Sequence, residues 1–236
     1  MYIYDDLTPA LKDILLNFTR GYTLWVSFEV DASKVDGIRE KWIETCGTNL
    51  PAWKRQDRKQ KGLPNAWAAA APVLGYPNKR QVILMATEQA LDFPESDLGR
   101  QKWIRRLPEF SDFVMVREAR ERGDCAWTWR IQERVLGLLE KQLVAMVKAG
   151  DRSAVATETR HMAALYPMFG GVRRQLARMI KSSGKLWAAT QPSPWPGQTA
   201  DKLPMMIGFK GRQRPGKEEA GSSGGKCDND RREFKQ

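Results

Sequence analysis

The cations of residues 172–187 (VRRQLARMIKSSGKLW) form the pattern with the clearest chemical meaning in this sequence. Four of them are spaced i, i+4, i+7 and i+11 and therefore share one face of an α-helix: Arg174, Arg178, Lys181 and Lys185. Arg173 adds a fifth cation, and the segment contains no acid. Because like charges on one helical face repel each other, the pattern predicts an anionic ligand, and nucleic-acid phosphates fit. Gly170 and Gly171 precede the segment, and free N–H groups at a helix start also favour phosphate.

A second cluster of cations lies in residues 50–65 (LPAWKRQDRKQKGLPN), where Asp57 is the one acid. Its cations directly follow a tryptophan, Trp53: Lys54, Arg55, Arg58, Lys59 and Lys61. Single-stranded nucleic acid is commonly held by cations along its backbone and by aromatic rings beneath its bases. The sequence therefore predicts that Trp53 stacks on a base. The alternative is that Trp53 anchors the loop to the core.

A third candidate, Trp25, lies in residues 22–30 (YTLWVSFEV), whose clean alternation predicts a half-buried strand. Trp25 shares a strand face with Thr23, Ser27 and Glu29, and exposed sheet aromatics stack bases in RRM-type domains. We therefore expect Trp25 either to bind nucleic acid or to join the core. Trp127 and Trp129 share a face with Ile131 and are predicted to be core residues.

Residues for metal-independent RNA cleavage are also present. Such cleavage needs a base for the ribose 2′-OH and cations for the phosphorane, and His161, Tyr166 and the Arg173/Arg174 pair lie close together in sequence. The alternative is that His161 is an ordinary surface histidine. His161 is also the only histidine, and no Cys/His cluster exists, so the sequence predicts neither a metal site nor a cofactor.

The overall charge supports a polyanionic partner. The chain has 236 residues and a formal net charge of +11, and the two basic segments carry most of that excess. An anionic membrane, an acidic protein partner and mere solubility are the alternatives. No apolar run is long enough to span a membrane, and acids near the N-terminus argue against a secretory signal. We therefore expect a cytoplasmic protein.

The elements that must position these residues indicate an α+β fold. Apolar periodicity predicts strands over residues 22–30, 82–86, 113–117 and 125–131, and helices over residues 7–18, 31–46, 97–106, 132–148, 152–166 and 172–187. This order contains the β-α-β-β-α run that opens a ferredoxin-like or RRM-like sheet, antiparallel or mixed, with insertions. A different four-stranded sheet is the main alternative.

Three regions are expected along the chain. Residues 1–148 are predicted to form the α+β core, with an irregular basic insertion over residues 48–80 that includes a short helix over 65–71. Residues 149–210 are predicted to form a helical hairpin and a return segment, with an edge strand over 204–209. The low apolar content of residues 211–236 predicts a disordered basic tail.

The basic, glycine-containing segment 208–216 (GFKGRQRPG), together with a βαβ-type sheet and basic helices, resembles the repeat-processing endoribonucleases of CRISPR systems, the RAMP superfamily. That resemblance implies cleavage of repeat RNA, although members usually carry a fuller glycine-rich loop. Segments 50–66 and 166–176 also resemble proteobacterial plasmid and mobile-element proteins.

Three functions follow as hypotheses. The first is a nucleic-acid-binding protein, with RNA or single strands favoured. The second is a metal-independent endoribonuclease of a CRISPR or mobile-element system. The third is a duplex DNA-binding protein for plasmid maintenance or regulation, since residues 152–187 resemble a helix-turn-helix in outline. A multiprotein complex is a further expected setting for any of these.

Overall fold

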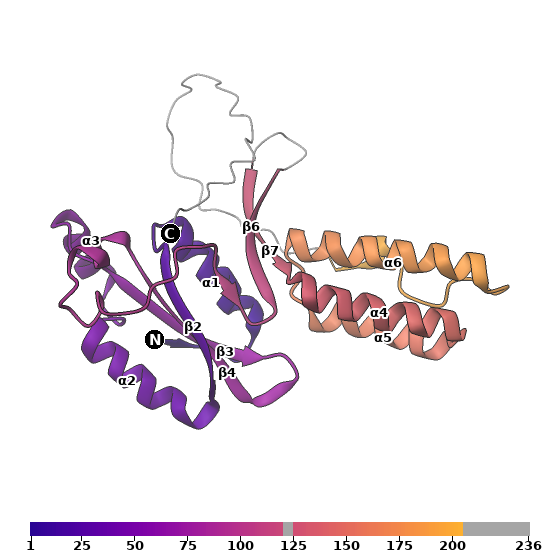
Figure 1. Cartoon of the computed structure of the whole chain (residues 1–236), viewed down its shortest axis with the longest axis horizontal. Helices are drawn as coiled ribbons and strands as arrows, with labels where there is room; N and C mark the ends of the chain where they lie inside the picture. Colours follow the sequence, from indigo (N-terminus) through magenta and orange to yellow (C-terminus); the bar gives the residue numbers. More distant parts are fainter. Residues whose placement is uncertain (120–124, 205–236) are drawn as a thin grey trace, which may run out of the picture.

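The first half of the chain builds a four-stranded sheet. In this computed structural model, which describes residues 1–119 and 125–204, the strands are β1 (Tyr2–Ile3), β2 (Leu24–Asp31), β3 (Ala66–Val73) and β4 (Tyr76–Ala86). Their order is β1-β3-β4-β2, with β1 parallel to β3 and the other pairs antiparallel. The strands β3 and β4 are therefore central, and β2 lies at one edge (Figure 1).

Helices cover both faces of this sheet. The helix α1 (Leu7–Thr19) packs on one face, and α2 (Val35–Cys46), preceded by the short turn Ala32–Lys34, packs on the other. Alternate alanines of β3 belong to the two separate buried clusters, so the small side chains let both helices approach the strand closely. The helix predicted over residues 65–71 is therefore wrong, because burial on two faces outweighs the helical propensity of alanine.

The region 48–80 was expected to be irregular, and that expectation is also wrong. It contains the helix α3 (Ala52–Gln60), all of β3 and the first part of β4. No residue of α3 is buried, and its composition is strongly polar. The segment therefore shows no apolar periodicity from which a helix could be predicted. Most residues between Pro51 and Gly62 are nevertheless good helix formers, which accounts for α3.

A second sheet follows. It contains β5 (Glu109–Phe110), β6 (Phe113–Ala119) and β7 (Cys125–Ile131) in the order β5-β6-β7, all antiparallel. The α+β class is confirmed, but the strands expected to extend one ferredoxin-like sheet form a separate sheet instead. The helix predicted over residues 97–106 is absent from this described region, where Ile104 pairs with Trp25 at the edge of the first sheet.

The last described part is a bundle of three helices. The helices are α4 (Glu133–Ala149), α5 (Arg152–Leu165) and α6 (Gly170–Thr190), and Asp151 caps α5 by accepting the Ala154 N–H at 2.9 Å. Both α5 and α6 pack against α4, so the expected hairpin is completed by a third helix. The short helix Ala200–Lys202 returns to α6. The strand expected over 204–209 and the tail over 211–236 lie outside the described residues, apart from Pro204.

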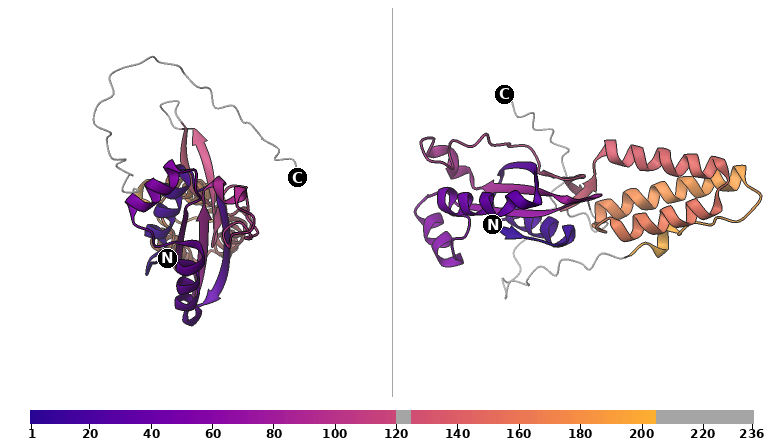
Figure 2. Two further views of the ribbon diagram at one scale, coloured as in Figure 1. Left: turned by 90° about the vertical axis from the view of Figure 1, so that its left-hand side faces the viewer. Right: turned by 90° about the horizontal axis from the view of Figure 1, so that it is seen from below.

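The molecule is elongated, with the four-stranded sheet at one end and the bundle at the other (Figures 1 and 2). The second sheet lies between them, and one buried cluster runs from α1 through this sheet into the bundle. Trp129 of β7 lies in this cluster and donates its indole N–H to the Leu11 carbonyl of α1 at 2.9 Å. The core prediction for Trp129 is confirmed, and Trp127 packs half-buried against the same cluster.

The helix α6 docks tightly on β7. The side-chain amide of Gln175 pairs with both backbone groups of Ile131, at 2.8 Å and 3.0 Å. The Gly171 N–H donates to the Thr128 hydroxyl at 3.1 Å. A Cβ atom on Gly171 would lie 2.4 Å from the Trp129 carbonyl oxygen, so this close approach requires glycine.

We predict that Gly171→Ala lowers the free energy of unfolding by about 1–3 kcal/mol, because α6 must move away from β7. Gly184→Ala in the same helix is the matched control, since its Cβ atom would find its nearest neighbour at 3.8 Å. The control is expected to stabilise the helix by up to about 1 kcal/mol. Urea unfolding of both variants measures the difference, and equal effects would contradict the proposed close contact.

Candidate nucleic-acid interface

The basic face of α6 is exposed along its length. Arg174, Arg178, Lys181 and Lys185 all lie at the surface, as the spacing predicted. The opposite side of the helix is buried in the bundle and against β7: Val172, Leu176, Met179, Ile180 and Trp187. The core therefore fixes which side of α6 faces solvent, and it is the side that carries the cations.

One end of this face meets a charge cluster on the second sheet. The Glu118 carboxylate of β6 forms ion pairs with Arg130 of β7 and with Arg174 of α6. Two guanidinium groups thus share one carboxylate, which leaves an excess of positive charge. Arg173, in the first turn of α6, is half-buried, and its Nε atom makes no hydrogen bond within the described structure. Glu118 and Arg130 were not identified from the sequence, because strand pairing and helix docking bring them to α6.

The other cations of the face have no acidic partner among the described residues. Within residues 1–119 and 125–204, Arg178, Lys181 and Lys185 form no ion pair. Asp201 has a lowered pKa, caused mainly by the Thr199 hydroxyl hydrogen bond, and Lys181 contributes least to that shift. Solvent-exposed cations without partners are available to bind phosphate oxygens.

Two expectations for this region are wrong. The N-terminus of α6 does not offer free N–H groups at Gly171, because that group is buried and already bonded to Thr128. The helix-turn-helix outline is not found either, since α5 and α6 both lie along α4 in a bundle (Figure 1). A recognition helix instead crosses its predecessor at a steep angle.

The helix α3 presents the second basic segment. Trp53 is 67% exposed, and the Lys54 ammonium lies 5.3 Å from its ring centroid. The core-anchor alternative for Trp53 is therefore excluded. Base stacking by Trp53 stays a prediction.

Other side chains of α3 attach the helix to the rest of the protein. Arg58 is half-buried and donates to the Pro64 carbonyl at 2.9 Å, whereas Lys61, which directly follows α3, makes only a local pair with Asp57 at 2.9 Å. The Arg55 carbonyl accepts a hydrogen bond from Asn65 at 3.0 Å, and its side chain is half-buried. Lys54 and Lys59 are exposed. Arg58 thus has a structural role, whereas Lys54 and Lys59 are available to a ligand.

The two basic segments do not form one site. Figures 1 and 2 place α3 at the sheet end of the molecule and α6 in the bundle at the opposite end. The sequence predicted nucleic-acid binding by both segments without placing them relative to each other, and the tertiary structure puts them far apart.

The binding prediction for Trp25 is wrong. Trp25 is 3% exposed, and its indole N–H donates to the Arg106 carbonyl at 2.7 Å. The polar face that it shares with Ser27 and Glu29 is covered at Trp25 by the segment that contains Ile104. A ring buried in this way cannot stack on a base.

The residues considered for RNA cleavage are not assembled by the structure. His161 is exposed on α5, in a shallow hollow formed with Thr157, Arg160 and Ala164 of the same helix. Tyr166 is 8% exposed and packs edge-on against Phe113 of β6. No hydrogen bond joins His161, Tyr166 and the two arginines among the described residues.

Neither a metal site nor a membrane-spanning helix is found within residues 1–119 and 125–204. No group of three His, Cys, Asp or Glu side chains there could hold a metal ion. None of the helices in this part combines the length and apolar character required to cross a bilayer.

Comparison of the chain with protein-family models, with curated proteins and with solved structures finds no match. The resemblance of the sequence to CRISPR repeat-processing endoribonucleases therefore stays a prediction, as does the resemblance to plasmid and mobile-element proteins.

Burial raises the pKa of Tyr166 to about 12, and the negative charges of Asp112 and Glu158 add to the shift. A tyrosine with this pKa is a poor acid or base near neutral pH, which argues for a packing role. Because the neutral phenol is favoured in the folded state, its contribution to stability is complete below about pH 10 and is lost as the pH rises toward about 12.

We predict that Tyr166→Phe has nearly wild-type stability at neutral pH, since the hydroxyl makes no hydrogen bond within the described structure. Between about pH 10 and 12 the variant should lose less stability than the wild type, because it lacks the group that ionises. Urea unfolding of both proteins across this range measures the difference. Parallel loss of stability in the two proteins would show that Tyr166 ionises as freely in the folded as in the unfolded chain.

Proposed function

We propose that this protein binds nucleic acid through the exposed basic face of α6. The observation that carries the proposal is the arrangement of Arg178, Lys181 and Lys185 on one solvent-facing side of a helix that contains no acid and whose other side is in the core. Nothing in the packing requires cations at these positions. Phosphates would neutralise them and relieve their mutual repulsion.

The dimensions of this face suit a polynucleotide. Arg174 and Lys185 are eleven residues apart, which corresponds to about 16 Å along a helix axis. Nucleotides of a strand that is stacked as in a duplex rise about 3.4 Å each, so the face matches the phosphates of about five stacked nucleotides. Arg174 is a weaker contributor than the other three, because Glu118 already neutralises part of its charge.

A single-stranded or unpaired ligand, RNA in particular, is the preferred class. The support is Trp53, whose exposed ring sits next to exposed lysines of α3, an arrangement that suits base stacking combined with backbone contacts. Because α3 and α6 lie at opposite ends of the molecule, we propose two contacts on one long strand. No contact among the described residues favours cleavage over binding, and none of the described helices is arranged as a recognition helix for duplex DNA.

The first test replaces two uncompensated cations of the face, with Arg178→Ala and Lys181→Ala combined. Affinity for a generic single-stranded oligonucleotide should fall, and the slope of log affinity against log salt should become shallower by about two units. Stability should be unchanged or slightly raised, because alanine favours helix and repulsion is removed.

The matched control is the double variant Arg39→Ala and Lys41→Ala on α2, which removes the same charge from another exposed helix. Its affinity and salt slope should stay close to those of the wild type. Equal losses in the two double variants would indicate binding through net charge alone and would reject α6 as the site.

A second test concerns Trp53→Ala. Loss of one stacked base should reduce the free energy of binding to single strands by about 1–3 kcal/mol and leave affinity for duplexes nearly unchanged. Stability should not change, because Trp53 is mostly exposed. Unchanged affinity for long single strands would remove α3 from the proposed path.

A further inference from the structure

The strand β2 forms an open edge of the first sheet. The Trp25 N–H donates to the Ile104 carbonyl at 3.1 Å, and the Ile104 N–H returns the bond at 2.8 Å, so the backbone groups of Trp25 point away from β4. Backbone groups of alternate strand residues point to the same side, so those of Ser27 and Glu29 also point outward. Beyond the ladder of β2 and β4, the backbones of Ser27 and Glu29 make no hydrogen bond within residues 1–119 and 125–204.

The strand β5 forms an edge of the second sheet, with β6 on its other side. The Met115 N–H of β6 donates to the Pro108 carbonyl at 2.9 Å. By the same alternation, the backbone groups of Glu109 point away from β6, and beyond the ladder of β5 and β6 they make no hydrogen bond among the described residues. Each sheet therefore presents an edge with unpaired backbone groups.

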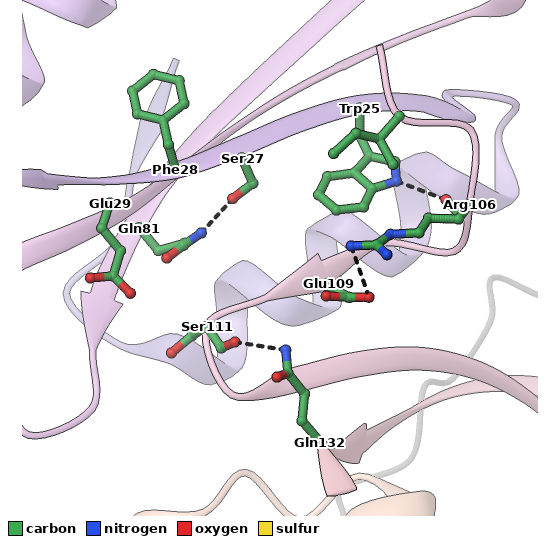
Figure 3. Close-up of a pocket in the computed structure, with 10 residues that line it drawn as sticks. Trp25, Ser27, Phe28, Glu29, Gln81, Arg106, Glu109, Ser111 and Gln132 are labelled. Carbon is green, nitrogen blue, oxygen red and sulfur yellow. Dashed lines mark hydrogen bonds and ion pairs between the residues drawn. The ribbon is translucent and has the colours of Figure 1, made fainter. Parts of the chain in front are cut away.

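A cleft of about 430 Å³ is lined by both of these edges (Figure 3). Polar side chains lie on both of its sides, among them Ser27, Glu29, Gln81, Glu109, Ser111 and Gln132. Ser111 has a positive φ of 54°, and its buried hydroxyl makes no hydrogen bond among the described residues. The cleft therefore combines two open strand edges with a hydroxyl that has bonding capacity left, and its volume lies in the range of pockets that hold ligands.

The charge around the cleft is opposite in sign to that of the chain. Glu29 is exposed and forms no ion pair in the described structure. Burial raises the pKa of Asp112, Arg134 at 3.8 Å opposes this shift, and the Glu29 carboxylate adds to it, so the two carboxylates lie within electrostatic range of each other. Arg106 pairs with Glu109 at 3.3 Å. Acids therefore outnumber cations here, in a chain whose formal net charge is +11.

The opposite face of β2 is apolar at the same point. The Phe28 ring is 41% exposed and lies edge-on to Trp42 of α2, with ring centroids 6.0 Å apart. Because successive side chains of a strand alternate between faces, a strand that pairs with β2 would place every second side chain beside Phe28 and the others beside Glu29. The complementary sequence therefore alternates apolar residues with lysine or arginine.

We propose that the cleft between β2 and β5 binds an extended basic segment of a partner protein, which adds to β2 as a further strand. The unpaired backbone groups of Ser27 and Glu29 supply main-chain hydrogen bonds, and the alternation of charge and apolar surface selects the sequence. Nucleic acid is a poor ligand here, because its phosphates would meet the carboxylates of Glu29 and Asp112. A second copy of β2 is also a poorer occupant, because edge-to-edge pairing would bring the Glu29 carboxylates of two copies to one cleft.

Hydrogen exchange of the full-length protein, followed by NMR without nucleic acid, tests this proposal independently of the proposed function. The probe is a capped peptide of about seven residues, a typical strand length, in which lysine and valine alternate. The Ser27 and Glu29 amides should exchange freely in the protein alone and at least about tenfold more slowly with the peptide at up to about 1 mM. The Phe28 amide, which points toward β4, reports in every sample that the sheet is intact.

A reversal of charge in the cleft tests its specificity. Glu29→Lys should abolish protection by the lysine peptide and should create protection by a matched peptide in which glutamate alternates with valine. The fold should tolerate this change, because Glu29 is exposed and has no ion pair among the described residues. The control Glu140→Lys makes the same change of charge on the exposed surface of α4, and its response to both peptides should match that of the wild type.

Unchanged exchange of Ser27 and Glu29 with the lysine peptide, or equal protection of the wild type by the lysine and glutamate peptides, would overturn the proposal. Protection of both amides in the protein alone would overturn it as well, because the edge would already be covered. The cover would be this chain if the protection survives dilution and a second copy if it does not. Protection by a single-stranded oligonucleotide would instead assign the cleft to nucleic acid.

Discussion

The architecture depends on β7 being held between two helices. On one side the indole of Trp129 donates to the Leu11 carbonyl of α1, and on the other side Gln175 of α6 bonds both backbone groups of Ile131. An edge strand normally leaves a row of backbone groups exposed, and here a glutamine side chain satisfies part of that row. Because α1 belongs to the four-stranded sheet and α6 to the bundle, this one strand connects the two ends of the molecule.

The same docking determines the electrostatics of the bundle. Gly171 allows α6 to approach the Trp129 carbonyl closely, which fixes the rotation of the helix about its own axis. The apolar side then faces α4 and β7, and the cations are turned toward solvent. The N-terminus of α6 is buried by this contact, so its Gly171 N–H is unavailable to a ligand. The proposed anion binding therefore rests on the side chains of α6.

Separation of the strands into two sheets has a second consequence. In a single ferredoxin-like sheet, β2 would have had neighbours from the later strands on its outer side. Because β6 and β7 instead pair, within the part of the chain that the structure describes, only with each other and with β5, β2 stays at an edge beside a polar cleft. The segment that contains Ile104 and Arg106 pairs with Trp25 at that edge and accepts its indole N–H, which explains why Trp25 joins the core and does not bind nucleic acid.

The sequence by itself determined the α+β class, the helices α1, α2, α4, α5 and α6, the strands β2, β6 and β7, and the exposed cationic face of α6. These features are local: apolar periodicity, capping and helical spacing are properties of neighbouring residues. The tertiary structure decided the rest. Ala66–Val73 became a strand because two helices cover it, and Glu118 joined Arg174 through strand pairing and helix docking. Trp25 is buried in the core, whereas Trp53 is exposed. The two basic segments lie at opposite ends of the molecule. Each of these outcomes depends on contacts between residues that are distant in sequence. Such contacts cannot be inferred from the local spacing of residue types.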